Sequence, residues 1–366
     1  MKNILVIFGG TALEKDVSVI TGVITANNLN KELFTAVPIF IDENGFWYTG
    51  AQLFDVSWYK TKNIKQLKRV CLLSGDNKLY LIKNHKLKAY KYAHCIINCI
   101  HGVNGEDGAI SMLANLSNIP MASPDAYSSC IAMDKYLTKL CLSALKINVL
   151  PYKTYSVGES VNKSGVKLKY PLIVKPLRQG SSIGIEKANN YDELVIKINK
   201  ALNYDERVIV EPYLQNLKEY NVAIYCDNEK IKVSNIEEPI TKNDILTFED
   251  KYSNGEKEFP ANVSKELELE IKRVSKKVYK GLNFFGIIRI DFLYDANKNK
   301  LYVNEINGVP GSLSCYLISD TFYEFSKILD KIIEEAIKNF NRRLTEVKKY
   351  ESTILNINGA KGNKLL

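Results

Sequence analysis

The chain of 366 residues has no apolar stretch as long as the ~18 residues that a membrane-spanning helix needs. Its N-terminal apolar segment is short and runs directly into a glycine pair, which is atypical of a signal peptide. Residues 3–9 are instead expected to form a buried strand. The sequence therefore predicts a cytoplasmic protein with no membrane association.

Metal-ligand spacing is also missing among the cysteines. The chain has seven cysteines, an odd number, and none forms paired CxxC motifs. Cys95 and Cys99 lie in an apolar run, as buried residues would. We interpret the cysteines as reduced thiols of a cytosolic protein.

Two common phosphate-binding motifs are absent. The sequence has neither the GxGxxG of dinucleotide-binding folds nor the GxxxxGK of a Walker A loop. The net charge of +9 is diffuse, and no basic stripe interleaved with aromatic residues is present. A lysine-rich surface without nucleic-acid binding is expected, and some positive potential also suits an enzyme that handles phosphates.

The most informative pattern that is present is a pair of apolar runs near the C-terminus. Residues 286–293 carry Arg289 and Asp291, and residues 301–307 carry Glu305 and Asn307. Side chains two apart on a strand share a face. Because residues 294–300 are rich in turn formers, the two runs are predicted to form a hairpin with all four polar groups on one surface.

This predicted surface offers two carboxylates, an amide oxygen and a guanidinium. Mg²⁺ prefers oxygen ligands and usually binds one or two carboxylates together with substrate phosphates. The pattern thus indicates an ATP site. The alternative is a surface hairpin with an ordinary arginine–aspartate pair.

The rest of the chain predicts an α/β fold with a β-rich elaboration over residues 36–92. Further strands are expected at residues 96–100, 170–176 and 207–212, with antiparallel strands over residues 217–240. Helices are expected at residues 16–28, 128–147, 191–203, 264–282 and 320–343. The polar segment Asn243–Ala261 is a candidate mobile loop.

Four other stretches fit an ATP site, although each has a plain structural explanation. Lys175 ends a strand shortly before the glycine-serine loop 180–184, whose backbone N–H groups suit phosphate oxygens. Lys135 lies in a helix, Glu211 ends a strand, and residues 101–108 form a glycine-rich loop in which Asp107 is expected to cap the next helix.

Taken together, these stretches resemble the D-alanine–D-alanine ligase family of the ATP-grasp superfamily, with the related D-Ala–D-Ser and D-Ala–D-lactate ligases. The resemblance runs from Ile4 to about Ile328. It rests on the order and spacing of residues 9–18, 101–108, 133–135, 173–176, 180–184, 251–252, 289–291 and 304–311.

The resemblance implies an ATP-grasp fold, in which an N-terminal open parallel α/β domain precedes two α+β domains that clamp ATP. The corresponding divisions are residues 1–122, 123–213 and 214–345, with a polar tail at residues 346–366. The mobile loop 243–261 would serve as a lid that excludes water from the reaction. A homodimer is implied by analogy with the family.

The resemblance also implies a reaction and a set of roles. ATP would phosphorylate the carboxylate of one D-alanine, and the amine of a second substrate would displace phosphate to form a peptide bond for peptidoglycan precursors. The metal ligands for two Mg²⁺ ions, or for Mn²⁺ in their place, would be Asp291, Glu305 and Asn307. The ATP-binding residues would be Lys135, Lys175, Ser182, Glu211, Leu214, Glu219 and Lys251.

The remaining roles concern the amino-acid substrates. Glu14 would bind the first ammonium, with His101 nearby and with Ser181 and Tyr252 in one hydrogen-bonded group. Arg289 and the backbone N–H of Gly311 would stabilise the oxyanion. Tyr252 favours an amine acceptor, because D-lactate ligases usually carry another residue there.

The sequence departs from the family at the acceptor carboxylate site, where a serine–leucine pair is usual. Here Tyr316 and Leu317 occupy those positions, and Gly308 replaces the more usual threonine. The expected acceptor is D-alanine, and the alternative is D-serine or another amine. The complete set of lysines and carboxylates argues against a catalytically silent ATP-grasp protein that only binds a nucleotide or a partner.

Overall fold

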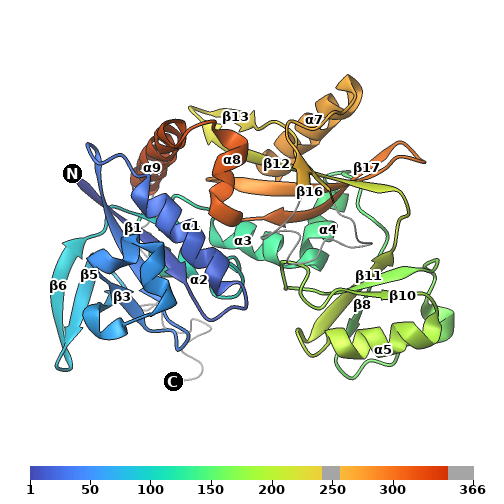
Figure 1. Cartoon of the computed structure of the whole chain (residues 1–366), viewed down its shortest axis with the longest axis horizontal. Helices are drawn as coiled ribbons and strands as arrows, with labels where there is room; N and C mark the ends of the chain where they lie inside the picture. Colours follow the sequence, from blue (N-terminus) through green and yellow to red (C-terminus); the bar gives the residue numbers. More distant parts are fainter. Residues whose placement is uncertain (241–255, 345–366) are drawn as a thin grey trace, which may run out of the picture.

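The computed structural model describes residues 1–240 and 256–344, and in this part the strands form three larger sheets and one two-stranded sheet. In Figure 1 the N-terminal residues, in blue, lie at the left, and the green residues near position 200 lie at the lower right. The orange and red residues of the C-terminal third lie above and between them. The mixture of helices and sheets confirms the predicted α/β class.

The first sheet is built on β1 (Lys2–Gly9), most of which is buried. This strand pairs in parallel with β2 (Phe34–Ile41) on one side and β7 (Cys95–Asn98) on the other. A continuous apolar run of this kind is typical of a strand covered on both faces. The helix α1 (Lys15–Asn27) follows β1 directly and packs on it, as the sequence predicted.

The first sheet continues beyond β2 as an antiparallel extension. Its strands are β3 (Trp47–Thr49), β4 (Lys68–Leu73), β5 (Asp76–Lys83) and β6 (Lys86–Tyr92), which complete the order β6-β5-β4-β3-β2-β1-β7. The β-rich elaboration expected for residues 36–92 is confirmed.

The second sheet is antiparallel and carries the strand order β10-β9-β11-β8. Its strands are β8 (Lys153–Ser156), β9 (Leu172–Pro176), β10 (Glu186–Ala188) and β11 (Arg207–Pro212). The helix α5 (Tyr191–Ala201) packs against β9 and β10 and buries its apolar face there.

The helix predicted over residues 128–147 is wrong as a single element. After α2 (Ala109–Leu116), the chain forms α3 (Ala126–Met133) and α4 (Lys135–Ala144) as separate helices. Asp134 breaks them because its backbone is extended, with φ −93° and ψ 107°, and its carboxylate accepts hydrogen bonds from the N–H groups of Tyr136 and Leu137. An aspartate at this position is a favourable N-cap.

The third sheet holds the predicted hairpin. Its strands are β12 (Leu217–Asp227), β13 (Lys230–Val233), β16 (Ile288–Asp295) and β17 (Lys300–Asn307), in the order β13-β12-β16-β17. The helix α7 (Lys265–Gly281) covers β12 and β13. The strands β14 (Glu238–Ile240) and β15 (Glu256–Glu258) pair with each other, and β15 lies within the loop predicted for residues 243–261.

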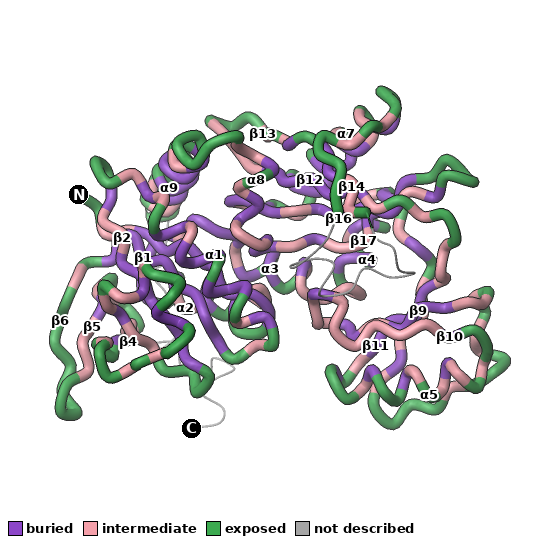
Figure 2. The backbone as a smooth tube through the Cα atoms, viewed as in Figure 1, coloured by how far each residue is buried: buried purple, intermediate pink, exposed green. Residues whose placement is uncertain are grey.

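The C-terminal elements return to the first sheet. The turn η5 (Gly311–Ser314) packs against α1, the short helix α8 (Cys315–Ile318) follows, and α9 (Phe322–Leu344) shares a hydrophobic core with β1. The buried purple segments of β1, α1 and α9 in Figure 2 mark this core. As a result, η5 is held between the first and third sheets.

Among the helices of residues 1–240 and 256–344, none combines the length and apolar character needed to cross a membrane.

Candidate functional site

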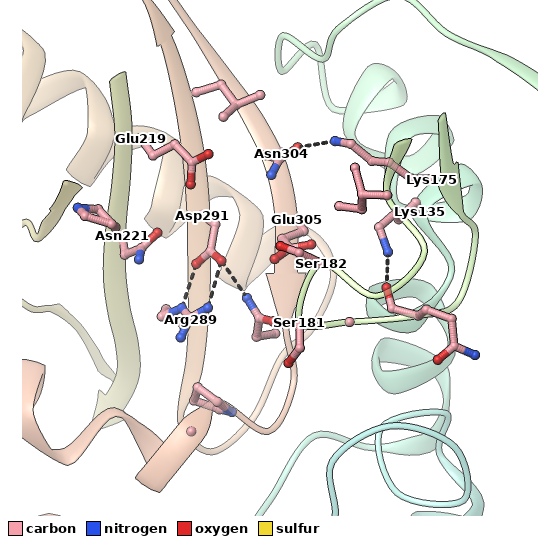
Figure 3. A pocket seen from close by; sticks show the side chains of 18 of the residues that line it. Lys135, Lys175, Ser181, Ser182, Glu219, Asn221, Arg289, Asp291, Asn304 and Glu305 are labelled. Atoms are coloured by element: carbon pink, nitrogen blue, oxygen red, sulfur yellow. Dashed lines mark hydrogen bonds and ion pairs between the residues drawn. The ribbon is translucent and has the colours of Figure 1, made fainter. Parts of the chain in front are cut away.

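The strands β16 and β17 place four polar side chains on one face. Arg289 lies opposite Asn307, and Asp291 lies opposite Glu305, in the antiparallel register. Residues two apart share a face and cross-strand neighbours lie side by side, so the four groups adjoin one another. The shared surface predicted from the sequence is confirmed, and Figure 3 shows Asp291 and Glu305 on neighbouring strands.

The arginine and aspartate on β16 form a tight pair. Nε of Arg289 donates to Oδ1 of Asp291 at 2.7 Å, and Nη2 donates to Oδ2 at 2.8 Å. Nδ2 of Asn307 also donates to Oδ2 of Asp291, at 3.2 Å. Asp291 is buried at the wall of a cavity. The pair is therefore not part of an ordinary surface hairpin.

The cavity has a volume of about 460 Å³, and its walls come from the second and third sheets, from α1 and from loops that follow strands of the first sheet. The predicted site residues that line it are Glu14, His101, Lys135, Lys175, Ser181, Ser182, Glu211, Leu214, Glu219, Arg289, Asp291, Glu305, Asn307, Gly311 and Tyr316. Leu317 is buried and does not line it. Lys251 and Tyr252 lie outside the described residues.

Two lysines face the hairpin across this cavity (Figure 3). Lys135 is the first residue of α4, because Asp134 ends the preceding helix, and its Nζ donates to the carbonyl oxygen of Gln179 at 2.6 Å. Burial lowers the pKa of Lys135. Lys175 on β9 donates to Oδ1 of Asn304 at 3.2 Å. The two ammonium groups place positive charge opposite the carboxylates of β16 and β17.

A third lysine, Lys139, was missed by the sequence analysis. The carboxylate of Glu211 is buried between Nζ of Lys139 and Nζ of Lys175, and the latter is 2.7 Å from Oε2. Burial opposes the charged form of Glu211, but the two lysines outweigh burial and lower its pKa to about 2. The spacing of four between Lys135 and Lys139 is a helical signal that both side chains lie on one face of α4.

The glycine-serine loop brings the N-terminal and central parts of the chain together. The hydroxyl of Ser181 donates to Oε1 of Glu14, and both side chains are buried. A Cβ on Gly180 would lie 2.9 Å from either carboxylate oxygen of Glu14, closer than such atoms approach. Ser181 and Ser182 have φ values of 50° and 60°, in the left-handed region. Glycine at position 180 is therefore required for this close approach.

The glycine-rich loop after β7 contributes two buried titratable groups. Burial and the nearby Arg289 lower the pKa of His101 to about 3. Burial and the charge of Glu14 raise the pKa of Glu106 to about 8. Glu106 accepts hydrogen bonds from the N–H groups of Gly102 at 3.0 Å and Val309 at 3.2 Å. It joins this loop to the segment after β17, a role that the sequence analysis missed.

The predicted cap at Asp107 is present in modified form. Its Oδ1 accepts the N–H of Ala109, the first residue of α2, at 3.0 Å, but Gly108 holds the N-cap position. The same carboxylate closes the loop, since Oδ2 accepts the N–H of Asn104 at 2.7 Å.

Tyr316 lies at the cavity wall in contact with a second missed carboxylate. Its hydroxyl donates to Oε2 of Glu237 at 3.3 Å. Lys257 pairs with Oε1 of Glu237 at 3.0 Å, and its Nζ lies 3.9 Å from the centroid of the Tyr316 ring. Burial raises the pKa of Tyr316, so the phenol stays protonated and donates. Glu237 was missed because residues 217–240 were interpreted only as strands.

Comparisons with known proteins match this chain along most of its length. A family model for the D-ala D-ala ligase N-terminus matches residues 3–124, and one for the D-ala D-ala ligase C-terminus matches residues 141–334. The D-alanine–D-alanine ligase of Thermosipho melanesiensis is 35% identical over 352 residues, which cover 93% of this chain and 95% of the relative.

Solved structures give the same result. The D-alanine–D-alanine ligase of Helicobacter pylori matches with a TM-score of 0.76 and 29% identity, covering 91% of this chain and 98% of that structure. VanG D-Ala:D-Ser ligase from Enterococcus faecalis matches with a TM-score of 0.78 and 28% identity, covering 92% and 99%. Both similarities extend over all three sheets.

Proposed function

The chain belongs to the D-alanine–D-alanine ligase family and is a ligase with the ATP-grasp fold, and we propose that it joins two D-alanines with ATP and Mg²⁺ through an acyl phosphate. The product would serve peptidoglycan precursor synthesis. The observation that carries the proposal is the cavity in which Lys135 and Lys175 face Asp291 and Glu305. Such an arrangement suits a polyphosphate bridged to carboxylates by cations.

The donor atoms fit Mg²⁺. Asp291, Glu305 and Asn307 offer carboxylate and amide oxygens, and Asn307 keeps its Oδ1 available while Nδ2 donates to Asp291. In the described part of the chain, no group of three or more histidine, cysteine or acidic residues is arranged to hold a metal by itself. A cation here would share its ligands with phosphate oxygens, as Mg²⁺ commonly does. We propose two Mg²⁺ ions, replaceable by Mn²⁺, which would neutralise phosphate charge during phosphoryl transfer.

The nucleotide would lie between the second and third sheets. Lys135, Lys175 and Ser182 would contact phosphate oxygens, together with Lys251. The carboxylate of Glu211 is already paired with two lysines, so it would position Lys175 rather than bind the nucleotide. The backbone of residues 211–214, including Leu214, would then contact adenine, and Glu219 would contact the ribose hydroxyls.

In the first step, a carboxylate oxygen of one D-alanine attacks the γ-phosphorus, and the bond to ADP breaks as ADP leaves with its electron pair. Glu14 would bind the ammonium of this D-alanine, oriented by Ser181 and by Tyr252. His101 would lie beside it at the same wall. Enclosure of the site by the loop 243–261 would keep water from the acyl phosphate.

In the second step, the neutral amine of the second D-alanine attacks the acyl carbon and forms the C–N bond. The C–O bond to phosphate breaks as phosphate leaves with its electron pair, and the nitrogen gives up one proton to the departing phosphate. Negative charge develops on the acyl oxygen. Arg289 carries a guanidinium with several N–H donors, and both it and Gly311 line the same wall of the cavity. We assign these donors to the oxyanion, because preorganised donors stabilise such charge.

The acceptor would bind beside Tyr316 and the backbone of Leu317. The names of the curated relatives support D-alanine over the other D-amino acids that the sequence left open. We also propose the domain division at residues 122, 213 and 345, and a homodimer, both from the family resemblance.

The test is phosphate release from ATP and Mg²⁺ in the presence of D-alanine, with D-serine and D-lactate as competing acceptors. We expect ADP, phosphate and the D-alanine dipeptide in equal amounts. Absence of turnover with D-alanine alone would refute the proposal, and preferential turnover of D-serine as acceptor would reassign the second substrate.

A further inference from the structure

A chain of hydrogen bonds runs from the segment after β17 through α1 to His101. The backbone N–H of Ser312 donates to Oγ1 of Thr21 at 2.9 Å, and the same oxygen lies 3.0 Å from Nε2 of His101. Thr21 is 0% exposed and His101 is 4% exposed. Three distant parts of the sequence therefore meet at one buried hydroxyl, where α1 packs against η5.

The direction of these bonds follows from the donors available. A backbone N–H only donates, so Oγ1 of Thr21 accepts from Ser312. Within residues 1–240 and 256–344, the hydroxyl has one other partner, Nε2 of His101. If Nε2 carried the proton, Oγ1 would accept twice and its own hydrogen would be buried without an acceptor, which is costly. The arrangement is satisfied when the hydroxyl donates to an unprotonated Nε2.

The ring of His101 must then carry its single proton on Nδ1. Its burial and the neighbouring guanidinium of Arg289 both oppose a second proton, so the imidazole is neutral. In a neutral imidazole one nitrogen donates and the other accepts, and the hydrogen bond to one nitrogen decides the tautomer. His101 lines the cavity, so its N–H donor is available to a ligand there.

We infer that Thr21 is a positioning residue that fixes His101 as the Nδ1–H tautomer, which donates to an anionic oxygen of the first amino acid. The identity of that ligand rests on the proposed function, whereas the tautomer does not. His101 then acts as a neutral donor beside Arg289 and not as a proton-transfer group. The carboxylate of the first D-alanine and the acyl phosphate formed from it both present suitable oxygens.

Thr21 also supports the backbone that follows Gly311. Ser312, Leu313 and Ser314 have φ values of 50°, 48° and 50°, three successive non-glycine residues in the left-handed region. Such residues persist only where their surroundings hold them. Because Oγ1 of Thr21 accepts the N–H of Ser312, the first of these three residues, the same hydroxyl couples them to His101.

The decisive measurement is ¹⁵N NMR of the 366-residue chain with its three histidines labelled. The spectrum is recorded without substrates at neutral pH, and His101→Gln assigns the signal. In the wild type we expect a protonated Nδ1 and an unprotonated Nε2. A protonated Nε2 in the wild type overturns the inference, whether or not any variant folds.

Three variants separate positioning from simple packing. Thr21→Val keeps the shape and removes the hydroxyl, so His101 should shift toward the Nε2–H tautomer. Thr21→Ser should restore the wild-type spectrum. Thr25→Val is the matched control, because Thr25 is also buried on α1 but bonds to the carbonyl oxygen of Thr21 and to Cys99. An unchanged His101 spectrum in Thr21→Val, or an equal change in Thr25→Val, contradicts the inference.

Kinetics supply the link to the ligand. In Thr21→Val, KM for the first D-alanine should rise about tenfold, the usual size of a lost hydrogen bond to a charged group. KM for ATP should change little, and Thr21→Ser should restore the wild-type KM for the first D-alanine. A parallel rise in both KM values would indicate general distortion and would contradict the assigned role. If the wild type gives no turnover, the proposed function fails, while the NMR result stands independently.

Discussion

Oε2 of Glu211 lies 2.7 Å from Nζ of Lys175, and both side chains are largely withdrawn from solvent. The same carboxylate pairs with Lys139, which is 2% exposed. Burial opposes the charge on Lys175, but Glu211 outweighs this and raises the pKa of Lys175. Lys175, which we propose to contact phosphate, is thereby kept protonated and is oriented by a carboxylate that is itself buried.

Removing Lys139 should destabilise the fold. In Lys139→Met the apolar stem remains, but Glu211 loses one of its two partners, and we expect the free energy of unfolding to fall by about 3 kcal/mol. Urea unfolding measures this change. Lys276→Met on α7 is the control for removal of a lysine. The double variant Lys139→Met/Glu211→Gln should regain part of the lost stability. If Lys139→Met had the same free energy of unfolding as Lys276→Met, the pairing of Lys139 with Glu211 would contribute nothing to stability.

The same pair predicts a dependence of stability on pH. The pKa of Glu211 is about 2 in the folded chain, below its ordinary value of 4.5. A depressed carboxyl pKa stabilises the fold above the ordinary value, and this contribution is lost as pH falls from about 4.5 to about 2. Comparing urea midpoints of wild type and Glu211→Gln across this window should show a smaller acid dependence in the variant. Parallel curves would contradict this assignment.

The sequence was most informative where strand periodicity and chemistry coincided. The alternation of Arg289 with Asp291 and of Glu305 with Asn307 predicted both the hairpin and its polar face, because one register settles all four positions. The strand β1 and the helices α7 and α9 followed from equally regular apolar patterns. These features depend on local periods of two or 3.6 residues.

The missed features depend on contacts between distant residues. Nothing near Thr21 in the sequence indicates that its hydroxyl accepts from Ser312, 291 positions later. In the sequence, Glu237 looks like an ordinary strand residue, and only the structure shows its contacts with Tyr316 and Lys257. The break at Asp134 is a local competition between a capping carboxylate and helix continuation, which apolar periodicity alone does not resolve.

Glu305→Gln should remove a proposed metal ligand and leave the fold intact. Turnover should fall about a thousandfold, the order of magnitude lost when a preorganised electrostatic group is removed. Mg²⁺-dependent binding of ATP, measured by calorimetry, should weaken. The melting temperature of the variant without nucleotide should stay near that of the wild type. Glu270→Gln on the exposed side of α7 is the control. Retained activity in Glu305→Gln would refute the metal-ligand role.

Tyr316→Ser should alter acceptor selection. The phenol fills the cavity wall beside Glu237, so its removal opens space and takes away packing for a small acceptor. We expect KM for the second D-alanine to rise about tenfold and turnover with bulkier D-amino acids as acceptors to increase. A change of this size is common when a contact in a substrate pocket is lost. Tyr316→Phe keeps the ring and should change selection much less. An acceptor preference identical in both variants and the wild type would mean that Tyr316 does not face the acceptor.

Gly180→Ala tests the contact between the glycine-serine loop and Glu14. The new Cβ would lie 2.9 Å from Oε1 and Oε2 of Glu14, so the carboxylate must shift away from the position in which Ser181 donates to it. Since Glu14 is proposed to bind the first ammonium, KM for the first D-alanine should rise about a hundredfold, as loss of a charge-assisted bond predicts. Gly308→Ala is the matched control, because its Cβ would meet only Pro124, at the ordinary distance of 3.8 Å. Steady-state kinetics with each substrate varied in turn distinguishes the two. If Gly180→Ala and Gly308→Ala gave the same KM for the first D-alanine, then Glu14 would not depend on the loop for its position, and its assignment to the first ammonium would lose its structural basis.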